Sequence, residues 1–418
     1  MNDNALFLSP DKNPWVRDEG LLPIQKAIRA AGGEIRVVGG AVRDAFMGQA
    51  TQDIDAATTL PPESVIKALT AAGIKVVPTG LAHGTITAII DHKGYEITTL
   101  RRDLQTDGRH ATVAYTDDWQ EDAARRDFTF NALYLKETGE IVDYFNGRED
   151  LAARLVRFIG DPAQRIDEDS LRILRAFRFL AQLSTPEQPA QLDDKALEAC
   201  QLKASHLTTL SGERLWKEMA ALLRTEAPIL ALQIMIKAGV MGYILPEGKN
   251  TSKLDNLIEL EKSVSISANA ITRLAALLDH GAAASVAKRF RLSNIERDGL
   301  LALESLAPAL LAPLSAFDLR QKLYENGKEV VQAALLLAAA GGEPHDLPVL
   351  WAQVQSWKKP AFPLRGEDLL KQGHAAGPRL GQALKKTEAW WCGQDFAPDH
   401  QACLQKAIEF LQGDSLKD

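Results

Sequence analysis

Apolar residues along this chain follow two different spacings, and the change from one to the other falls near residue 150. Before that point, short runs rich in β-branched residues alternate with segments in which apolar positions recur every three or four residues. After it, Ala, Leu, Arg and Glu dominate, and the helical spacing continues almost without interruption. The pattern predicts an α+β fold, with a mixed sheet and helices in the N-terminal head and an all-helical remainder.

The N-terminal region predicts two helices and a series of short strands. Residues 21–32 and 61–73 have the amphipathic spacing of helices, and both stretches end at a glycine. Short breaks at residues 92–94 and 138–139 separate neighbouring strand candidates, which predicts two hairpins. Strands are expected over residues 35–38, 75–78, 85–91, 95–100, 130–135 and 140–144.

The C-terminal remainder carries helical spacing in many separate stretches. Neither a repeat of fixed period nor a low-complexity tract connects them, and weak breaks in composition fall at residues 183–190 and 341–347. Helices are expected over residues 168–182, 193–202, 211–224, 227–239, 254–262, 268–279, 295–305, 317–325, 328–340 and 401–412.

Composition excludes several classes of protein. The chain has 418 residues, enough for about two to four globular domains. Three scattered cysteines without a C-x-x-C pair argue against a disulfide framework or a zinc ribbon. The polar N-terminus is unlike a secretory signal, and the longest apolar run, Ala333–Ala340, is far too short for a membrane span. We therefore expect a cytoplasmic protein without a membrane partner.

Charge is distributed unevenly along the chain. The net charge of −7 argues against a protein that binds nucleic acid over its whole surface. Basic residues nevertheless gather between Arg101 and Arg178, whereas the rest of the chain carries the acidic excess. We therefore expect the surface that binds a nucleotide or RNA to be confined to that stretch. Lys288–Arg291 forms a second, smaller basic cluster, which fits either an RNA phosphate contact or a solvated helix end.

A glycine pair follows the first predicted strand. Gly39 and Gly40 stand where that strand would pass into a helix, so a phosphate could approach the backbone and the free amide groups of the helix start. Arg43 would lie one turn into the helix, within reach of a triphosphate oxygen. Taken alone, the pair is more simply explained as a tight turn.

Three carboxylates stand at positions that favour a metal site. In Asp53–Ile54–Asp55 the two aspartates are two residues apart, so on a strand their side chains would point to the same face. Such a pair repels itself unless a divalent cation lies between the two groups, and these oxygen ligands suit Mg2+. Glu96, on the second strand of the first predicted hairpin, would project from the same sheet.

We therefore predict Asp53, Asp55 and Glu96 as catalytic residues, with the two aspartates holding the metal. In a site with two cations, one activates an attacking hydroxyl and the other steadies a leaving pyrophosphate. Considered singly, the aspartate pair also fits an exposed acidic strand edge, and Glu96 fits a solvated strand position.

Five sequence motifs follow one another along the chain. The first joins G-G-A-V-R-D at 39–44 to D-I-D at 53–55, and the second is R-R-D-F-T-F-N-A at 125–132. The remaining motifs are D-Y-F-N-G-R-E-D-L at 143–151, E-D-S-L-R-I-L-R-A-F-R-F at 168–179 and S-G-E-R-L-W-K-E at 211–218. In this order they resemble the DNA polymerase beta nucleotidyltransferase superfamily, and more narrowly the class II tRNA nucleotidyltransferases (CCA-adding enzymes) and bacterial poly(A) polymerases. Ala41 and Phe130 depart from the family's usual Cys and Ile by apolar exchanges.

The resemblance implies an enzyme that extends RNA 3′ ends, with protein side chains in place of a nucleic-acid template. Arg125 and Arg126 can neutralise triphosphate charge, and Asp127 can orient them or contact the nucleotide sugar. Side chains three residues apart on a helix share one face, where acceptors and donors can match the edge of a base. A salt-bridged helix face is the simpler explanation of that spacing on its own. The residues concerned are Asp169, Arg172, Arg175 and Arg178, and the resemblance implies that the first two select C and A.

The resemblance also suggests how the chain is divided and what it binds. We expect CTP and ATP as nucleotide substrates, a tRNA bound at its acceptor end and elbow, and a monomer or homodimer. The polar stretch 101–113 is similar to the family's flexible loop, which helps to switch from C to A addition. The expected parts are a catalytic head at 1–150, a base-recognising neck at 151–225, a body at 226–340 and a tRNA-binding tail at 341–418.

Two other functions compete with CCA addition. A poly(A) polymerase would share every catalytic motif, but the chain has no long basic C-terminal tail, which favours tRNA as the substrate. A non-catalytic RNA-binding protein would be expected to have lost a carboxylate, yet Asp53, Asp55 and Glu96 are all present.

Overall fold

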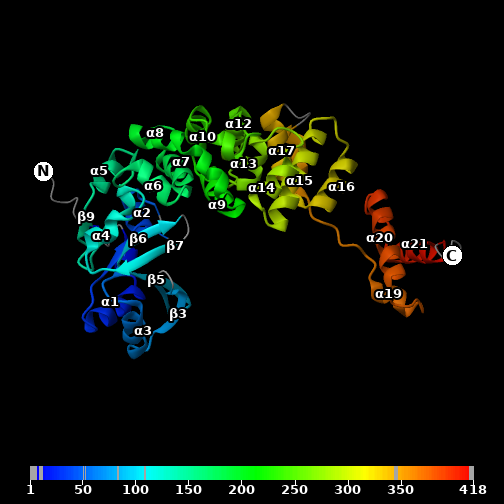
Figure 1. Ribbon diagram of the computed structural model, residues 1–418. Helices are drawn as coiled ribbons and strands as arrows, with labels where there is room; N and C mark the ends of the chain where they lie inside the picture. The colour runs from blue at the N-terminus through cyan, green and yellow to red at the C-terminus, as the bar shows by residue number, and fades with distance from the viewer. Residues whose placement is uncertain are drawn as a thin grey trace. The chain divides into compact units, whose positions relative to one another are not determined.

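The computed structural model describes residues 7–8, 13–49, 51, 53–81, 84–107, 110–342 and 347–413. The chain divides into two compact units, Met1–Pro246 and Glu247–Asp418. The fold is α+β as predicted, because a mixed sheet with helices comes first and helices dominate the rest of the chain (Figure 1). Across the described part of the chain, every helix is too short or too polar to cross a membrane.

A seven-stranded sheet forms the centre of the first unit (Figure 1). In spatial order its strands are β3 (Lys75–Gly80), β4 (Thr85–Ile90), β5 (Lys93–Thr99), β2 (Asp55–Thr58), β1 (Ile35–Val38), β8 (Leu133–Leu135) and β9 (Ile141–Asp143). β1 pairs antiparallel with both β2 and β8, whereas β2 and β5 run parallel. The parallel pair matters for the site because it brings two segments about forty residues apart in the chain into register.

Two amphipathic helices, α1 (Leu21–Ala30) and α3 (Pro62–Ala71), pack against each other and against strands of the sheet. Their buried residues Ile24, Ile28, Val65 and Leu69 follow the three-and-four spacing that the sequence predicted. They join inward-facing residues of the strands, such as Ile86, in one apolar core. The core fixes the sheet on which the functional side chains are mounted.

Both predicted hairpins are present. The turn between β4 and β5 consists of Asp91 and His92, which have positive φ angles of 49° and 65°, as a two-residue turn of this kind requires. It lies one residue earlier than the break that the sequence suggested. Gly139, with φ of 84°, lies in the turn between β8 and β9.

A third hairpin was not predicted. β6 (Arg101–Asp107) and β7 (His110–Tyr115) form a two-stranded antiparallel sheet where the sequence analysis expected the family's flexible loop. The polar sequence has little apolar alternation, but the backbone hydrogen bonds between the strands do not depend on side-chain polarity. Gly108 and Arg109 lie outside the described residues.

The predicted helix 168–182 is broken in two. α6 (Pro162–Glu168) ends before Asp169, and α7 (Leu171–Leu183) begins after Ser170. Asp169 has an extended backbone, with φ of −155° and ψ of 106°, and its carboxylate accepts a hydrogen bond from the amide of Leu171. Aspartate favours such positions because its side chain competes for backbone amides. The expectation that Asp169 shares a helix face with Arg172 is therefore wrong.

The remaining helices of the first unit include several that are too short for periodicity to reveal. α7 packs against α9 (Gly212–Leu223) and α10 (Pro228–Lys237), which the sequence predicted. The other helices are α2 (Gly40–Phe46), α4 (Trp119–Ala124), α5 (Gly147–Ala152), α8 (Asp194–Leu202) and α11 (Met241–Ile244).

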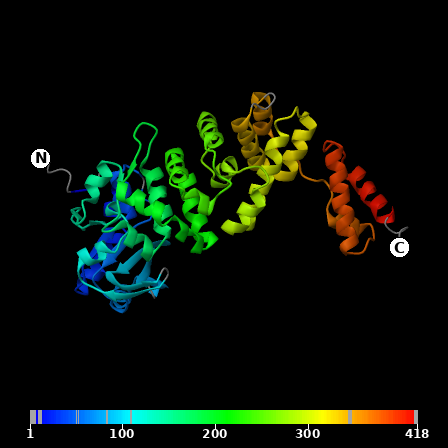
Figure 2. The same ribbon diagram turned by 45° about the horizontal axis from the view of Figure 1, so that its top comes forward.

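The second unit is helical throughout its described residues. Its helices are α12 (Ser252–Ser263), α13 (Ala270–Leu277), α14 (Ala283–Phe290), α15 (Asn294–Ala309), α16 (Ala316–Asn326), α17 (Lys328–Gly341), α18 (Leu347–Ser356), α19 (Gly366–Lys371), α20 (Pro378–Gly393) and α21 (His400–Gly413). α12, α13, α15 and α17 pack together, and α20 lies beside α21 in both views (Figures 1 and 2). In the basic cluster at the end of α14, Arg289 is paired with Glu247 and Phe290 is buried, so Lys288 and Arg291 are its exposed members.

Candidate active site

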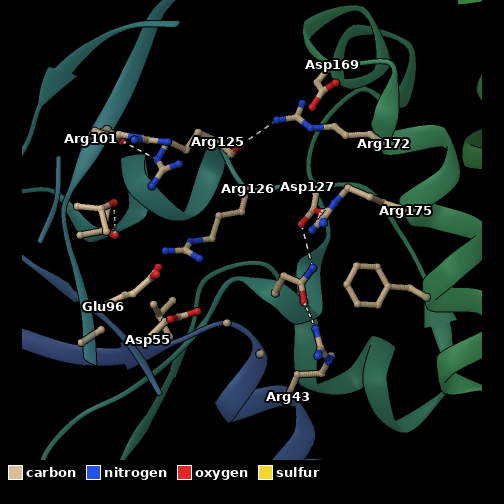
Figure 3. Close-up of a pocket in the computed structure, with 18 of the residues that line it drawn as sticks. Arg43, Asp55, Glu96, Arg101, Arg125, Arg126, Asp127, Asp169, Arg172 and Arg175 are labelled. Carbon is tan, nitrogen blue, oxygen red and sulfur yellow. Dashed lines mark hydrogen bonds and ion pairs between the residues drawn. The ribbon is translucent and has the colours of Figure 1, made fainter. Parts of the chain in front are cut away.

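A cavity of about 700 Å³ opens in the first unit between the sheet and α7 (Figure 3). Asp55 and Glu96 lie on the side of the sheet, whereas Asp169, Arg172 and Arg175 lie on the side of α7. The structure thus brings together residues that are up to 141 positions apart, from Val38 to Phe179. The predicted site residues in its lining are Gly39, Gly40, Arg43, Asp55, Glu96, Arg125, Arg126, Asp127, Asp169, Arg172, Arg175 and Arg178.

The predicted carboxylates lie at one end of the sheet. Asp55 is the first residue of β2, and the parallel register places it directly beside Glu96 of β5. Asp53 precedes the strand and is exposed, and it is not part of the cavity lining, so the expectation of two aspartates within one strand holds only for Asp55. Figure 3 shows the side chains of Asp55 and Glu96 on the same side of the cavity.

Negative charge at this end is only partly balanced by the protein. Within the described residues, Asp53, Asp55 and Glu96 make no hydrogen bond or ion pair through their side chains. Loss of water in the cavity raises the pKa of Asp55, the charges of Glu96 and Asp53 raise it further, and the charge of Arg126 opposes them. No three acidic, histidine or cysteine side chains in the described ranges converge into a ready-made metal cluster. The unbalanced carboxylates nevertheless form a donor set that suits a hard divalent cation.

The turn between β1 and α2 forms the floor of the cavity. Gly39 has φ of 71°, a conformation that residues with a side chain rarely adopt, and a Cβ atom here would lie 3.7 Å from Nη1 of Arg126. Arg43 donates from Nε to Asp44 at 2.9 Å and from Nη1 to Oδ1 of Asn131 at 2.8 Å. The arginine is therefore held at a set position next to the glycine turn.

Asp122, which the sequence analysis did not single out, orients both arginines of the second motif. Its Oδ1 accepts from Arg125 at 2.6 Å, and its Oδ2 accepts from Arg126 at 3.0 Å and from the Tyr134 hydroxyl at 2.8 Å. Burial acts to raise the pKa of Asp122, but the charges of Arg126 and Arg125 outweigh it and lower the pKa to about 2. The buried carboxylate stays ionised and fixes two cations at the cavity wall.

Asp127 does not orient Arg125 or Arg126, which was one of the two roles expected for it. It binds Arg175 of α7, which donates from Nε to Oδ2 at 2.7 Å, whereas Asp122 holds Arg125 and Arg126. Asp127 Oδ1 accepts from Nδ2 of Asn131 at 2.9 Å and from the amide of Phe128 at 2.9 Å. Burial acts to raise the pKa of Asp127, but Arg175 and these hydrogen bonds lower it.

The fourth motif is held in place by residues of α6 and α9. Arg214 donates from Nη2 to both carboxylate oxygens of Asp169, at 3.0 and 2.8 Å. Arg172 donates from Nη1 to Glu168 at 2.5 Å and from Nη2 to the backbone carbonyl of Arg125 at 3.3 Å. Asp169 and Arg172 therefore both face the cavity with defined orientations, although they do not share a helix (Figure 3).

Glu218 of α9 balances the last two arginines of the motif. It lies 2.6 Å from Nε of Arg178 and 3.7 Å from Nη1 of Arg175. The guanidinium of Arg178 also stacks over the ring of Phe179, with 4.1 Å to the ring centroid. Burial and the neighbouring cations Arg175 and Arg43 lower the pKa of Arg178, with Glu218 opposing them.

Two protein families match parts of this chain. The family described as "Poly A polymerase head domain" matches residues 35–157, and "Probable RNA and SrmB- binding site of polymerase A" matches residues 191–251. The chain is 36% identical over 382 residues to "CCA tRNA nucleotidyltransferase 1, mitochondrial" of Mus musculus. The aligned region covers 89% of this chain and 86% of that protein. The chain belongs to the CCA-adding enzyme family.

Other members of the CCA-adding enzyme family extend the match to nearly the whole chain. A CCA-adding enzyme of Levilactobacillus brevis is 32% identical over 376 residues, covering 88% of this chain and 91% of that one. The crystal structure of the Bacillus stearothermophilus CCA-adding enzyme in complex with CTP is similar with a TM-score of 0.72 at 26% identity, covering 96% of this chain and 99% of the other. The family resemblance predicted from the five motifs is confirmed.

Membership in the CCA-adding enzyme family identifies the chain as a nucleotidyltransferase acting on RNA 3′ ends and implies use of a divalent metal. The sequence analysis assigned no supporting role to five residues of the site, although the last four stand inside its motifs: Asp122, Asn131, Glu168, Arg214 and Glu218. Some signal was present: Asp122 stands four residues before Arg126, the spacing of a helical ion pair. The partners of Asp169 and Arg178 lie 45 and 40 residues away in the chain, and only the packing of α7 on α9 brings them close.

Proposed function

We propose that the chain is a CCA tRNA nucleotidyltransferase, which adds C, C and A to the 3′ end of tRNA from CTP and ATP. The observation that carries the proposal is one cavity that joins the Asp55–Glu96 pair to the oriented side chains of Asp169 and Arg172. The two ends of such a cavity suit the two ends of a nucleotide, a triphosphate with its cations and a base. Relatives named for CCA addition support the choice of reaction.

In this reaction the 3′ hydroxyl oxygen of the RNA attacks the α-phosphorus of the nucleotide. The new oxygen–phosphorus bond forms as the bond to the bridging oxygen breaks, and pyrophosphate leaves with the electron pair of that bond. We assign Asp53 and Asp55 as ligands of Mg2+, with Glu96 assisting. When bound, this cation supplies charge neutralisation and favours deprotonation of the attacking hydroxyl.

Three arginines that line the cavity suit the triphosphate. Arg125 and Arg126 are held by one ionised carboxylate, Asp122, so two cationic groups are balanced by a single negative charge. Arg43, beside the turn at Gly39 and Gly40, adds a third cation. The surplus positive charge fits phosphate oxygens, and guanidinium groups bind them with two parallel hydrogen bonds.

We assign base recognition to Asp169 and Arg172, with Arg175 and Arg178 completing that wall. A carboxylate accepts and a guanidinium donates, so a pair with fixed orientation distinguishes the edges of cytosine and adenine from those of uracil and guanine. Arg214 and Glu168 supply the fixed orientation. The residues that would act as the template are thus anchored before a nucleotide arrives.

We propose that the tail, residues 341–418, contacts the tRNA through the outer face of α20. The buried positions of this helix are Leu380, Ala383, Thr387 and Trp391, which leaves Arg379, Lys385 and Lys386 exposed on other faces. Glu388 is the one acidic residue in α20, and it accepts a hydrogen bond from Tyr324. Exposed basic side chains suit the phosphate backbone of a structured RNA.

The remaining assignments extend the same proposal. We divide the chain into a head at 1–150, a neck at 151–225 that carries base recognition, a body at 226–340 and the tail. We propose a cytoplasmic enzyme that acts as a monomer or homodimer. Poly(A) polymerase activity is the alternative, because the head-domain family is named for it.

The test uses a tRNA transcript that lacks its last three nucleotides, with Mg2+ and labelled CTP or ATP supplied singly and together. CCA addition predicts a product that stops at +2 with CTP alone and at +3 with both nucleotides. A long ladder from ATP alone on any RNA would instead establish a poly(A) polymerase.

Replacing Lys385 and Lys386 by Gln should raise the KM for tRNA and leave the KM for CTP unchanged, and the exposed pair Lys358 and Lys359 offers the matched control. An unchanged KM for tRNA would contradict the role proposed for α20.

A further inference from the structure

A chain of hydrogen bonds crosses the floor of the cavity from α2 to α7 through a single amide. Arg43 donates from Nη1 to Oδ1 of Asn131 at 2.8 Å, and Nδ2 of Asn131 donates to Oδ1 of Asp127 at 2.9 Å. Arg175 completes the chain by donating to the other oxygen of Asp127. Figure 3 draws the links between Arg43 and Asp127 as dashed lines. One end of the chain lies beside the glycine turn, and the other lies on α7, the wall assigned to the base.

The chemistry of the neighbours fixes the orientation of the Asn131 amide. A guanidinium can only donate, and the ionised carboxylate of Asp127 can only accept. The amide therefore has to turn its oxygen toward Arg43 and its nitrogen toward Asp127, since the reverse orientation would place donor against donor and acceptor against acceptor. Leucine, which has the same shape, offers neither contact, and an ionised aspartate offers only the first.

Both groups are buried, since Asn131 is 7% exposed and Asp127 is 9% exposed. Asp127 Oδ1 accepts from Asn131 and from the amide of Phe128, while Oδ2 accepts from Nε of Arg175 and lies 2.5 Å from its Nη2. Asp127 is therefore arranged to hold Arg175.

We propose that Asn131 is a positioning residue that sets Arg43 and Arg175 relative to each other and thereby sharpens the choice of nucleotide. This inference rests on the proposed function, in which Arg43 faces the triphosphate and α7 faces the base. A nucleotide is bound at both its triphosphate and its base. The protein can distinguish one base from another accurately only if the two ends of the cavity keep a fixed spacing. If this hydrogen-bonded link were lost, a nucleotide with an incorrect base could bind in a reactive position. Loss of the link would therefore lower selectivity more than it lowers the turnover of the correct nucleotide.

The experiment uses the full chain and measures kcat/KM for CTP and UTP on tRNA lacking its CCA end, and for ATP on tRNA that already ends in CC. The Asn131→Leu variant is expected to lower the CTP-to-UTP ratio by about 10-fold to 100-fold, the range for losing buried hydrogen bonds to charged groups. Asn256→Leu is the matched control, because it removes an amide bonded at 3.1 Å to the carbonyl of Ala340, away from the cavity. The control should keep the wild-type ratio.

A second variant, Asn131→Asp, provides a readout that a merely structural role would not move. When protonated, the introduced carboxyl can donate to Asp127 and accept from Arg43, as the amide does. When ionised, it repels Asp127. The kcat/KM of this variant relative to wild type should therefore rise several-fold as the pH falls from about 8 to about 6. The charged groups around the position are Arg43 and Asp44 of α2, Asp127, Arg175 and Arg178 of α7, and Glu218 of α9.

Three results separate the outcomes. A wild-type chain that does not extend the tRNA would defeat the proposed function, and the binding of CTP and UTP to wild type and variants by calorimetry would then test Asn131. A wild-type ratio in Asn131→Leu, or equal losses for all three nucleotides, would overturn the inference. If Asn131→Leu does not fold, a pH-independent relative activity of Asn131→Asp would overturn it in the same way.

Discussion

The two walls of the cavity differ in whether their charged side chains have partners of opposite charge. On the sheet wall, formed by Asp55 and Glu96, neighbouring carboxylates have no ion-pair or hydrogen-bond partner among the described residues, and the pKa of Asp55 is raised. On the arginine wall each guanidinium is matched to a carboxylate. Its members are Arg125, Arg126, Arg172, Arg175 and Arg178, held by Asp122, Glu168, Asp127 and Glu218.

The difference shows what each wall is built to do. Unbalanced carboxylates carry a repulsion that a bound cation would relieve, so the sheet wall is incomplete until a ligand supplies positive charge. Arginines already held by partners lose little freedom when a ligand binds, so the arginine wall is organised in advance. Mutation should therefore uncouple activity from stability on the sheet wall and affect both together on the arginine wall.

The largest expected effect is on the sheet wall. Asp55→Asn should lower kcat by about 1000-fold, because a divalent cation contributes several kcal/mol of charge stabilisation and each 1.4 kcal/mol is about tenfold. The unfolding temperature should stay the same or rise, since the substitution removes a repulsion with Glu96. Nucleotide incorporation and thermal unfolding measure the two effects, with the exposed Glu63→Gln as control. Retained activity, or a clear loss of stability, would break the contrast between the walls.

The next largest effect is on the arginine wall. Asp122→Ala should destabilise the fold by about 3 kcal/mol, because it leaves two partly buried guanidinium groups without their shared partner. Urea unfolding measures the loss, and incorporation assays should show reduced activity in the same variant. Asp117→Ala, at an exposed position nearby, is the matched control. A variant as stable as wild type would mean that Asp122 does not anchor this wall.

Acid should weaken the same anchor. The pKa of Asp122 is lowered from 3.8 to about 2, so its ionised form favours the folded state at neutral pH. This contribution, about 2 kcal/mol, is complete above about pH 4 and is lost as the pH falls toward about 2. The difference in unfolding free energy between wild type and Asp122→Asn should accordingly shrink from pH 5 to pH 3. A difference that stays constant over this range would contradict the lowered pKa.

The smallest expected effect concerns an anchor outside the lining of the cavity. Arg214→Lys removes the planar guanidinium group that donates to both carboxylate oxygens of Asp169. The selectivity for CTP over UTP should therefore fall by about tenfold, while the free energy of unfolding changes little. Arg224→Lys, at an exposed position following the same helix, should leave selectivity unchanged and serves as the control. Equal selectivity in both variants would show that Asp169 keeps its orientation without Arg214.

The sequence by itself determined the fold class, the main strands and helices, and twelve of the nineteen described residues that line the cavity. These features depend on local sequence. Apolar spacing indicates which face of a segment is buried, and the types and order of the motif residues indicate their chemistry. The hairpins at Asp91–His92 and Gly139 were predictable from short-range turn signals. The arrangement of Gly39, Gly40 and Arg43 after β1 was equally local.

Only the tertiary structure decided how the predicted residues are held. The positions of Glu218 and Arg214 against α7 depend on contacts between segments about forty residues apart in the chain. Spacing along a sequence cannot specify such contacts, because they arise from the packing of α9 on α7. The chemistry of the site was therefore readable from the residues, whereas the geometry that makes it selective came from long-range packing.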